Sequence, residues 1–215
     1  MALNSTPAAN PDPYNRTGLW AQSFTGKMIF PADPRPEDYC IEDMAHSLSL
    51  MCRFNGMCRV HYSIAQHSIM VSKVARRLAR ERGYNRLAQC LYAICGFKHD
   101  GQESQCQDVI RPLKVLLLDY PPLEEKNAKA MAYYFKIPYE LLSHDVIKIA
   151  DDVALRTEQR DLFGPPPAPW TFRPDSFALP GKIRPLTWRR AEKAFLAHYH
   201  ELRDEAARLG IPYGP

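Results

Sequence analysis

Two histidines and two aspartates of this chain stand where the hydropathy pattern places the protein interior. His67 lies on the apolar row of a predicted helix, and His99 and Asp100 end a long apolar run. Asp151 has aliphatic residues four positions before and four positions after it, so its carboxylate should point toward the core. Burying a charge is costly unless the charge is paired or binds a metal. We therefore predict that these four side chains meet around one metal ion.

The predicted ligand set consists of two imidazole nitrogens and two carboxylate oxygens. This set suits a divalent transition metal such as cobalt, manganese, zinc, nickel or iron, and magnesium is a candidate for a second ion. Taken singly, His67 also fits a core histidine, and His99 fits a side chain facing a helix C-terminus. Asp152 is predicted to be exposed instead, because Lys148 and Arg156 flank it at four-residue spacing.

The elements that must position these residues are predicted to be helices, because apolar residues recur along the chain at helical spacing. The predicted helices cover residues 38–54, a segment starting near 63, 86–100, 124–136, 144–163 and 187–209. A short β-hairpin fits residues 20–30, and strands are otherwise nearly absent. The sequence thus predicts an all-α fold.

The chain is predicted to divide into three parts. A polar segment over residues 1–24 should be flexible, and residues 25–163 should form the helical domain that holds the metal. Glycine and three prolines then break the helical pattern after residue 163, since proline lacks a backbone donor. We expect residues 164–215 to form a proline-rich arm and a last helix that packs on the domain or on a second subunit.

Composition indicates a globular protein that can bury a sizeable core, with 215 residues, 46% of them hydrophobic, and a net charge of +4. The six cysteines form no C-x-x-C pair and are interpreted as reduced thiols of a cytoplasmic protein. We expect no membrane association, because the start of the chain lacks the apolar stretch of a signal peptide. The longest aliphatic run, residues 115–118, is also too short to span a bilayer.

Four stretches of the sequence resemble the HD-domain metal-dependent phosphohydrolases. They are YSIAQHS (62–68), HDGQES (99–104), QDVIRPLK (107–114) and KIADDVALRTEQRDL (148–162). In order and spacing they are most similar to the branch that contains bacterial 5′-deoxyribonucleotidases and certain phage dATP triphosphohydrolases. The resemblance covers roughly residues 25–163 and implies an HD-domain helical bundle, in a bacterial cytoplasm or, for a phage protein, in that of its host.

The resemblance implies a role for each matching residue. His67, His99, Asp100 and Asp151 would hold the metal, and Asp100 would also take part in catalysis. Glu103 matches the catalytic glutamate of the family.

Four further matches concern the substrate. Arg53 matches an arginine that grips phosphate, and Phe54 matches an aromatic residue beside the nucleoside. Asp108 matches an aspartate that contacts the sugar 3′-hydroxyl, and Lys114 matches a lysine near the polyphosphate. The expected substrate is therefore a deoxynucleotide, attacked at its 5′-phosphorus by a metal-activated water.

Several functions stay open at this point. The enzyme could release phosphate from a monophosphate or triphosphate from a dNTP, and Lys114 with the basic net charge favours the polyphosphate. Relatives are dimers or larger, so a homo-oligomer is implied. A non-catalytic nucleotide sensor and a nucleic-acid-binding helical protein are the alternatives. The arginine cluster over residues 74–86 is better explained as a solvated helix face, so no nucleic acid partner is expected.

Three other histidines are assigned different positions. His46 is interpreted as a core residue or a neighbour of the metal ligands. His144 is expected in a loop or at a helix cap, and His198 is expected at the surface.

Overall fold

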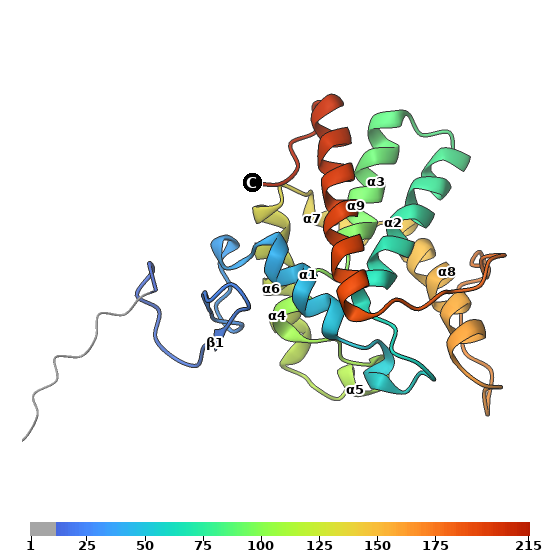
Figure 1. The fold of residues 1–215 in the computed structure, drawn as a ribbon, viewed down its shortest axis with the longest axis horizontal. Coiled ribbons are helices and arrows are strands. Elements are labelled where there is room, and N and C mark those ends of the chain that lie inside the picture. Colours follow the sequence, from blue (N-terminus) through green and yellow to red (C-terminus); the bar gives the residue numbers. More distant parts are fainter. Residues whose placement is uncertain (1–11) are drawn as a thin grey trace, which may run out of the picture.

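The computed structural model describes residues 12–215, which form a helical bundle with one small hairpin (Figure 1). The helices are α1 (Ile41–Leu50), α2 (Ile64–Glu81), α3 (Arg86–Lys98), α4 (Glu103–Cys106), α5 (Arg111–Lys114), α6 (Tyr120–Tyr134), α7 (Tyr139–Leu142), α8 (Asp145–Leu162) and α9 (Trp188–Arg208). Strand β1 (Ala21–Gln22) pairs antiparallel with β2 (Met28–Ile29). Two 3₁₀ turns, η1 (Pro36–Asp38) and η2 (Phe54–Gly56), flank α1. The predicted all-α class and the hairpin are confirmed.

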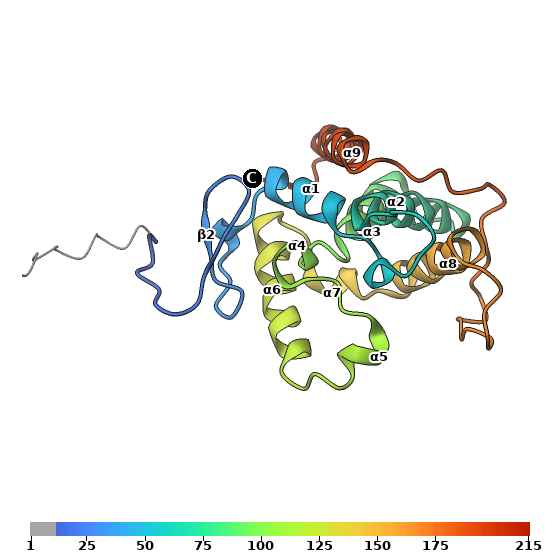
Figure 2. The same cartoon turned by 60° about the horizontal axis from the view of Figure 1, so that its bottom comes forward.

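Helix α2 lies at the centre of the bundle and packs against α3, α8 and α9. Figure 2 shows α9 on one side of α2 and α8 on the other. Helix α3 is apolar on nearly every side, and its residues from Tyr92 to Lys98 are all buried. Burial of these apolar faces is the main stabilising contribution to the fold. As a result, the C-terminal end of α3, where His99 and Asp100 follow, is held deep between its neighbours.

Local sequence determines where the long helices begin. Ser63 accepts a hydrogen bond from the backbone N–H of Gln66 at 3.2 Å, and the Asn85 side chain accepts one from Ala88 at 2.9 Å. Such N-cap bonds satisfy donors that have no partner inside the helix. His144 caps α8 in the same way, so its predicted role is confirmed.

Two predicted helix boundaries were wrong. Helix α1 ends at Leu50 and not near residue 54, because Cys52 pairs with Ser63 in a β-bridge and the chain then turns. Helix α6 begins at Tyr120 and not at 124. Two prolines occupy its first turn, where the missing backbone donors are not needed.

The beginning of the described chain is anchored by one buried arginine. Arg16 forms ion pairs of 2.7 Å with both Asp12 and Asp38, and all three side chains are buried. This network ties the segment before the hairpin to the entry of α1. Residues 1–11 of the segment predicted to be flexible lie outside the described residues.

The proline-rich arm between α8 and α9 has no regular structure, but polar side chains of α8 bind its backbone. Asp152 accepts a hydrogen bond from the backbone N–H of Arg173, which corrects the predicted pairing of Asp152 with its helix neighbours. Thr157 Oγ1 accepts from Leu179 at 2.9 Å, and Asp161 accepts from Ile183 at 2.8 Å. One face of α8 therefore fixes the course of the arm.

Across residues 12–215, no helix combines the length and the hydropathy that a bilayer-spanning helix needs. The predicted cytoplasmic location stays a prediction. The six cysteines are free thiols, and Cys95 is a fully buried core residue.

Candidate metal centre

The structure brings the four predicted ligands together from helices α2 and α8 and from the turn that follows α3. His67 Nε2 lies 3.2 Å from Asp151 Oδ1 and 3.5 Å from Asp100 Oδ2. His99 Nε2 lies 3.1 Å from Asp100 Oδ2 and 3.7 Å from Asp151 Oδ1. The two imidazole Nε2 atoms are 3.3 Å apart. Residues separated by up to 84 positions in the sequence thus meet at one point.

Both imidazoles are oriented by acceptors on their other ring nitrogen. His67 Nδ1 lies 2.7 Å from a carboxylate oxygen of Glu158, and His99 Nδ1 lies 2.9 Å from the carbonyl oxygen of Gly96. A carbonyl and a carboxylate only accept, so Nδ1 is the donor in both rings. In the neutral rings, the Nε2 lone pairs of His67 and His99 therefore face each other. Only a cation or a proton between them makes that arrangement favourable.

The pKa values of the two histidines and of Asp100 also indicate that the centre stabilises positive charge. Desolvation opposes protonation of His99, but Asp100 and Asp151 outweigh it and raise the pKa of His99 to about 10. Burial and Arg53 oppose protonation of His67, yet the surrounding carboxylates raise its pKa well above the usual value. Burial also disfavours the Asp100 carboxylate, but the two imidazoles hold its pKa well below the usual range. The cluster attracts either protons or a metal ion.

The buried group formed by His67, His99 and Asp100 could hold a metal ion, since one ligand atom from each lies within 4.8 Å of the others. Within the described part of the chain, no such group is found away from this centre. The Asp151 side chain lies at the open edge of the cluster and is 45% exposed. The donor set is that of a divalent transition metal. Asp151 therefore lies beside this group, on the side that solvent reaches.

Glu158 is the residue of the centre that the sequence interpretation missed. Its side chain is fully buried, and besides His67 it contacts Arg53 Nε at 3.1 Å. Histidine ligands in metal sites commonly donate their second N–H to such a carboxylate, which fixes the ring. Glu158 follows Asp151 by seven residues on α8, so both side chains share one helix face. This seven-residue spacing from Asp151 is the feature of the sequence that could have identified Glu158.

Arg53 lies at the centre, as predicted from the resemblance. Its Nη1 atom is 3.7 Å from Asp100 Oδ2, and only 9% of the residue is exposed. The turn that follows it is strained, because Phe54 and Asn55 adopt positive φ angles of 57° and 52°. Left-handed backbone costs roughly 1–2 kcal/mol per non-glycine residue, and such strain is concentrated at binding sites. The hydrogen bond from Arg53 N–H to the Tyr62 carbonyl, 2.9 Å long, holds this turn against the start of α2.

Glu103 is buried beside the centre at the start of α4. It is 4% exposed, and its Oε2 atom has no hydrogen-bond partner among the described residues. Burial first, and then the charges of Asp100 and Asp108, raise the pKa of Glu103 well above its usual value. The surroundings of Glu103 therefore favour its protonated form over the carboxylate.

The other two predicted substrate residues lie around the same centre without direct contacts to the ligands. Burial raises the pKa of the Asp108 carboxyl, and Arg53 and Asp100 both act on its charge. Lys114 Nζ forms an ion pair of 2.8 Å with Glu124 on α6. The Lys114 ammonium is therefore already paired, and no local pattern around residue 114 predicts this pairing.

Phe54 belongs to an aromatic cluster that includes residues from the end of α8 and from the arm. Its ring centroid lies 4.9 Å from that of Phe163 and 6.1 Å from that of Trp170. The Arg53 guanidinium carbon lies 5.1 Å from the Phe54 centroid. The sequence interpretation assigned no role to Phe163 or Trp170, because nothing local links them to residue 54.

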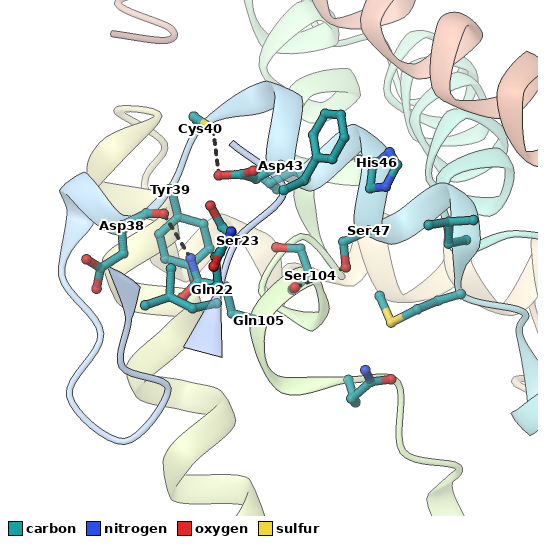
Figure 3. A pocket seen from close by; sticks show the side chains of 16 residues that line it. Gln22, Ser23, Asp38, Tyr39, Cys40, Asp43, His46, Ser47, Ser104 and Gln105 are labelled. Carbon is teal, nitrogen blue, oxygen red and sulfur yellow. Dashed lines mark hydrogen bonds between the residues drawn. The ribbon is translucent and has the colours of Figure 1, made fainter. Parts of the chain in front are cut away.

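A separate hollow of about 330 Å³ lies between the hairpin, α1 and α4, and none of the four predicted ligands lines it (Figure 3). His46 is in this hollow, stacked on Phe24 with ring centroids 3.8 Å apart. The interpretation of His46 as a neighbour of the metal ligands was therefore wrong. Its Nδ1 atom lies 3.4 Å from Glu192 on α9.

Fold and site together define a helical protein whose bundle core carries a histidine–aspartate group able to hold a metal ion.

A comparison with known protein-family profiles finds no match. The chain is 33% identical over 141 residues to "Uncharacterized protein YfdR" of Escherichia coli strain K12, an alignment that covers 66% of this chain and 71% of that protein. It is 32% identical over 194 residues to "Uncharacterized protein RCAP_rcc00048" of Rhodobacter capsulatus, covering 85% of this chain and 95% of that protein. The chain belongs to the same family as these two proteins.

Proposed function

We propose that this protein is a metal-dependent phosphohydrolase of the HD-domain type that acts on deoxynucleotides. The observation that carries the proposal is the pair of converging Nε2 atoms, 3.3 Å apart, with carboxylates of Asp100 and Asp151 beside them. This donor set suits a divalent ion such as cobalt, manganese, zinc, nickel or iron. His67, His99, Asp100 and Asp151 would hold it. When bound, such an ion polarises a phosphoryl oxygen and lowers the pKa of a bound water.

Glu103 supplies the proton chemistry in this proposal. Burial raises its pKa and favours the protonated carboxyl, and its unpartnered Oε2 atom leaves it free to exchange a proton. The protonated carboxyl can deliver a proton to a leaving oxygen, and the carboxylate can take one from water. Asp100, whose pKa is held low, stays ionised and serves as a ligand.

Arg53 supplies the contact to phosphate. Glu158 holds its Nε atom, while Nη1 reaches the Asp100 side of the centre. A guanidinium oriented in this way can form bidentate hydrogen bonds to a phosphate group. Glu158 thus links the metal-binding histidine to the phosphate-binding arginine.

The substrate can be a monophosphate or a triphosphate. Pairing with Glu124 reduces the positive charge that Lys114 offers to a polyphosphate, so the preference drawn from the sequence is weakened. Asp108 remains the candidate for the sugar 3′-hydroxyl. The basic net charge of +4 is compatible with either anion.

The decisive experiment incubates the protein with all dNMPs, dNTPs and ribonucleotides, each with a panel of divalent ions, and identifies the products. Release of phosphate or of triphosphate from deoxynucleotides is the expected result. Glu103→Gln keeps the shape of the side chain but cannot exchange the proton, so it should lose activity and retain metal binding.

Two other results would replace the proposal. Strong thermal stabilisation by dNTPs without turnover in any ion would identify a nucleotide sensor. Salt-dependent binding to DNA that is unchanged in His67→Ala and His99→Ala variants would identify a nucleic-acid-binding protein.

A further inference from the structure

We propose that Trp170 of the proline-rich arm, together with Phe54, forms the wall on which the base of the substrate stacks. This inference rests on the proposed function, because it assigns the nucleoside side of that same site. Trp170 would be the residue that distinguishes a nucleotide from a sugar phosphate.

The wall starts directly beside the phosphate-binding arginine. Arg53 is the residue before Phe54, and its guanidinium carbon lies 5.1 Å from the Phe54 ring centroid while its Nη1 atom lies 3.7 Å from Asp100. A nucleotide whose phosphate contacts Arg53 has its sugar and base one step further out. The side chains that this sugar and base would then meet are aromatic.

Three rings from distant parts of the sequence form the wall. Phe163 and Trp170 have centroids 5.3 Å apart, and both contact Phe54 at 4.9 and 6.1 Å. All three residues are only half-buried, so the cluster keeps accessible ring surface. Aromatic rings of this kind stack on bases of any sequence, because every base has a π-face.

The position of Trp170 is fixed by the helix that also carries a metal ligand. Asp152 of α8 accepts a hydrogen bond from Arg173 N–H, and the Arg156 guanidinium lies 4.5 Å from the ring centroid of Phe172. The prolines before Trp170 further restrict the backbone. The same helix therefore carries Asp151 and holds the part of the arm that directly follows Trp170.

The test uses the full-length protein and two substrates. One is the deoxynucleotide that proves best, and the other is the corresponding deoxyribose phosphate without a base. Trp170→Leu keeps an apolar side chain but removes the stacking surface. We expect KM for the nucleotide to rise about tenfold with kcat nearly unchanged, since stacking on one aromatic residue is worth about this factor. The base-free substrate should be unaffected, and Trp170→Phe should restore most of the loss.

Phe177→Leu is the matched control. Phe177 is an aromatic residue of the same arm, but it packs against Arg77 of α2, away from Phe54. This variant should leave both substrates unaffected. Equal losses on both substrates in Trp170→Leu would show that the arm only packs the structure, and would overturn the inference.

A binding measurement separates this inference from the proposed function. In a Trp20→Phe, Trp188→Phe background, Trp170 is the sole tryptophan. Deoxyadenosine monophosphate with zinc should quench its fluorescence, and deoxyribose 5-phosphate should not. If the protein hydrolyses nothing, the proposed function fails, and quenching by the nucleotide alone still supports the wall. Absence of quenching overturns it whatever the activity.

Discussion

Two neighbouring residues at the end of α3 lie in opposite surroundings. His99 faces the carboxylates of Asp100 and Asp151, which outweigh its desolvation and raise its pKa to about 10. Lys98 points to the other side and is fully buried, with its Nζ atom 3.8 Å from the ring centroid of Phe135. No carboxylate contacts it, and burial lowers the pKa of Lys98 well below the usual value.

A second pair of residues repeats this contrast. His67 is surrounded by carboxylates, and its pKa is raised despite complete burial. His198 on α9 lies against the Phe97 ring and contacts Ser72 Oγ at 2.9 Å. Burial first, and then the charge of Lys73, lower the pKa of His198 to about 4. The expectation that His198 is a surface residue was wrong, since its side chain is only 13% exposed.

The difference shows that the partner, and not the depth of burial, decides whether a basic group keeps its charge. Where α3 faces α2 and α8, carboxylates surround the basic side chains and stabilise positive charge. Where α3 faces α9, aromatic rings supply only weak cation–π attraction, and desolvation prevails. One helix therefore separates a region that binds positive charge from a region that excludes it.

Asp151→Ala tests the carboxylate region most severely. We expect hydrolysis to fall by at least about 100-fold, because a bound metal supplies several kcal/mol of transition-state stabilisation and each 1.4 kcal/mol is tenfold. Phosphate release in the presence of cobalt or manganese is the measurement. The melting temperature should change little, since the side chain is 45% exposed. Asp204→Ala, on an exposed position of α9, is the control. Parent-like turnover would remove Asp151 from the site.

Glu158→Gln tests the buried carboxylate that joins the two halves of the centre. Removing its charge leaves Arg53 buried without its closest partner, so the free energy of unfolding should fall by about 3 kcal/mol. Metal affinity should drop by roughly 10–100-fold, because a neutral amide oxygen is a weaker acceptor for His67 Nδ1–H than a carboxylate. Urea denaturation and titration calorimetry measure the two effects. Glu140→Gln, at an exposed position, should change neither. Unchanged metal affinity in Glu158→Gln would contradict the orienting role.

The pH dependence of stability tests the aromatic region through His198. Its pKa is about 4 in the folded protein and near 6.5 in the unfolded chain, so only the unfolded chain takes up a proton between these values. Stability should therefore be complete above pH 6.5 and fall as the pH drops toward 4, by roughly 3 kcal/mol in total. Lys73 and Arg76 oppose the proton and Glu201 favours it.

The matched variant for this prediction is His198→Gln, which can still donate to Ser72 but does not titrate. Urea denaturation at pH 7 and pH 4.5 should show a smaller loss of stability in the variant than in the parent. Equal losses would mean that the surroundings of His198 do not exclude charge.

Lys98→Met gives the smallest expected effect. It tests the aromatic region by removing the buried amine. Among the described residues, the only hydrogen-bond partner of the Lys98 amine is Met44 Sδ, at a long distance of 3.7 Å. A buried amine without a good partner is destabilising, so a thioether of similar length should stabilise the fold by about 1 kcal/mol. Thermal unfolding is the measurement. A lower melting temperature would show that the contacts of Lys98 with the aromatic rings outweigh its desolvation.

Much of the fold could be predicted from the sequence, because its long helices carry their own local signals. Ser63 caps α2 as expected, and α3 and α8 begin and end within two residues of their predicted limits. The early end of α1 could not be predicted, since it depends on the bridge between Cys52 and Ser63. The early start of α6 was missed because prolines occupy positions 121 and 122 of its first turn, and proline usually interrupts a helical pattern.

The sequence by itself determined which residues have chemistry to perform and which helix faces carry them. Periodicity places His67 and Asp151 on core-facing rows, and this needs no knowledge of the rest of the chain. Only the tertiary structure decided that Glu158 supports His67, that Trp170 meets Phe54, and that His99 and Lys98 differ in charge. These contacts join residues from separate elements, and the energy of a buried charge depends on neighbours that local sequence does not specify.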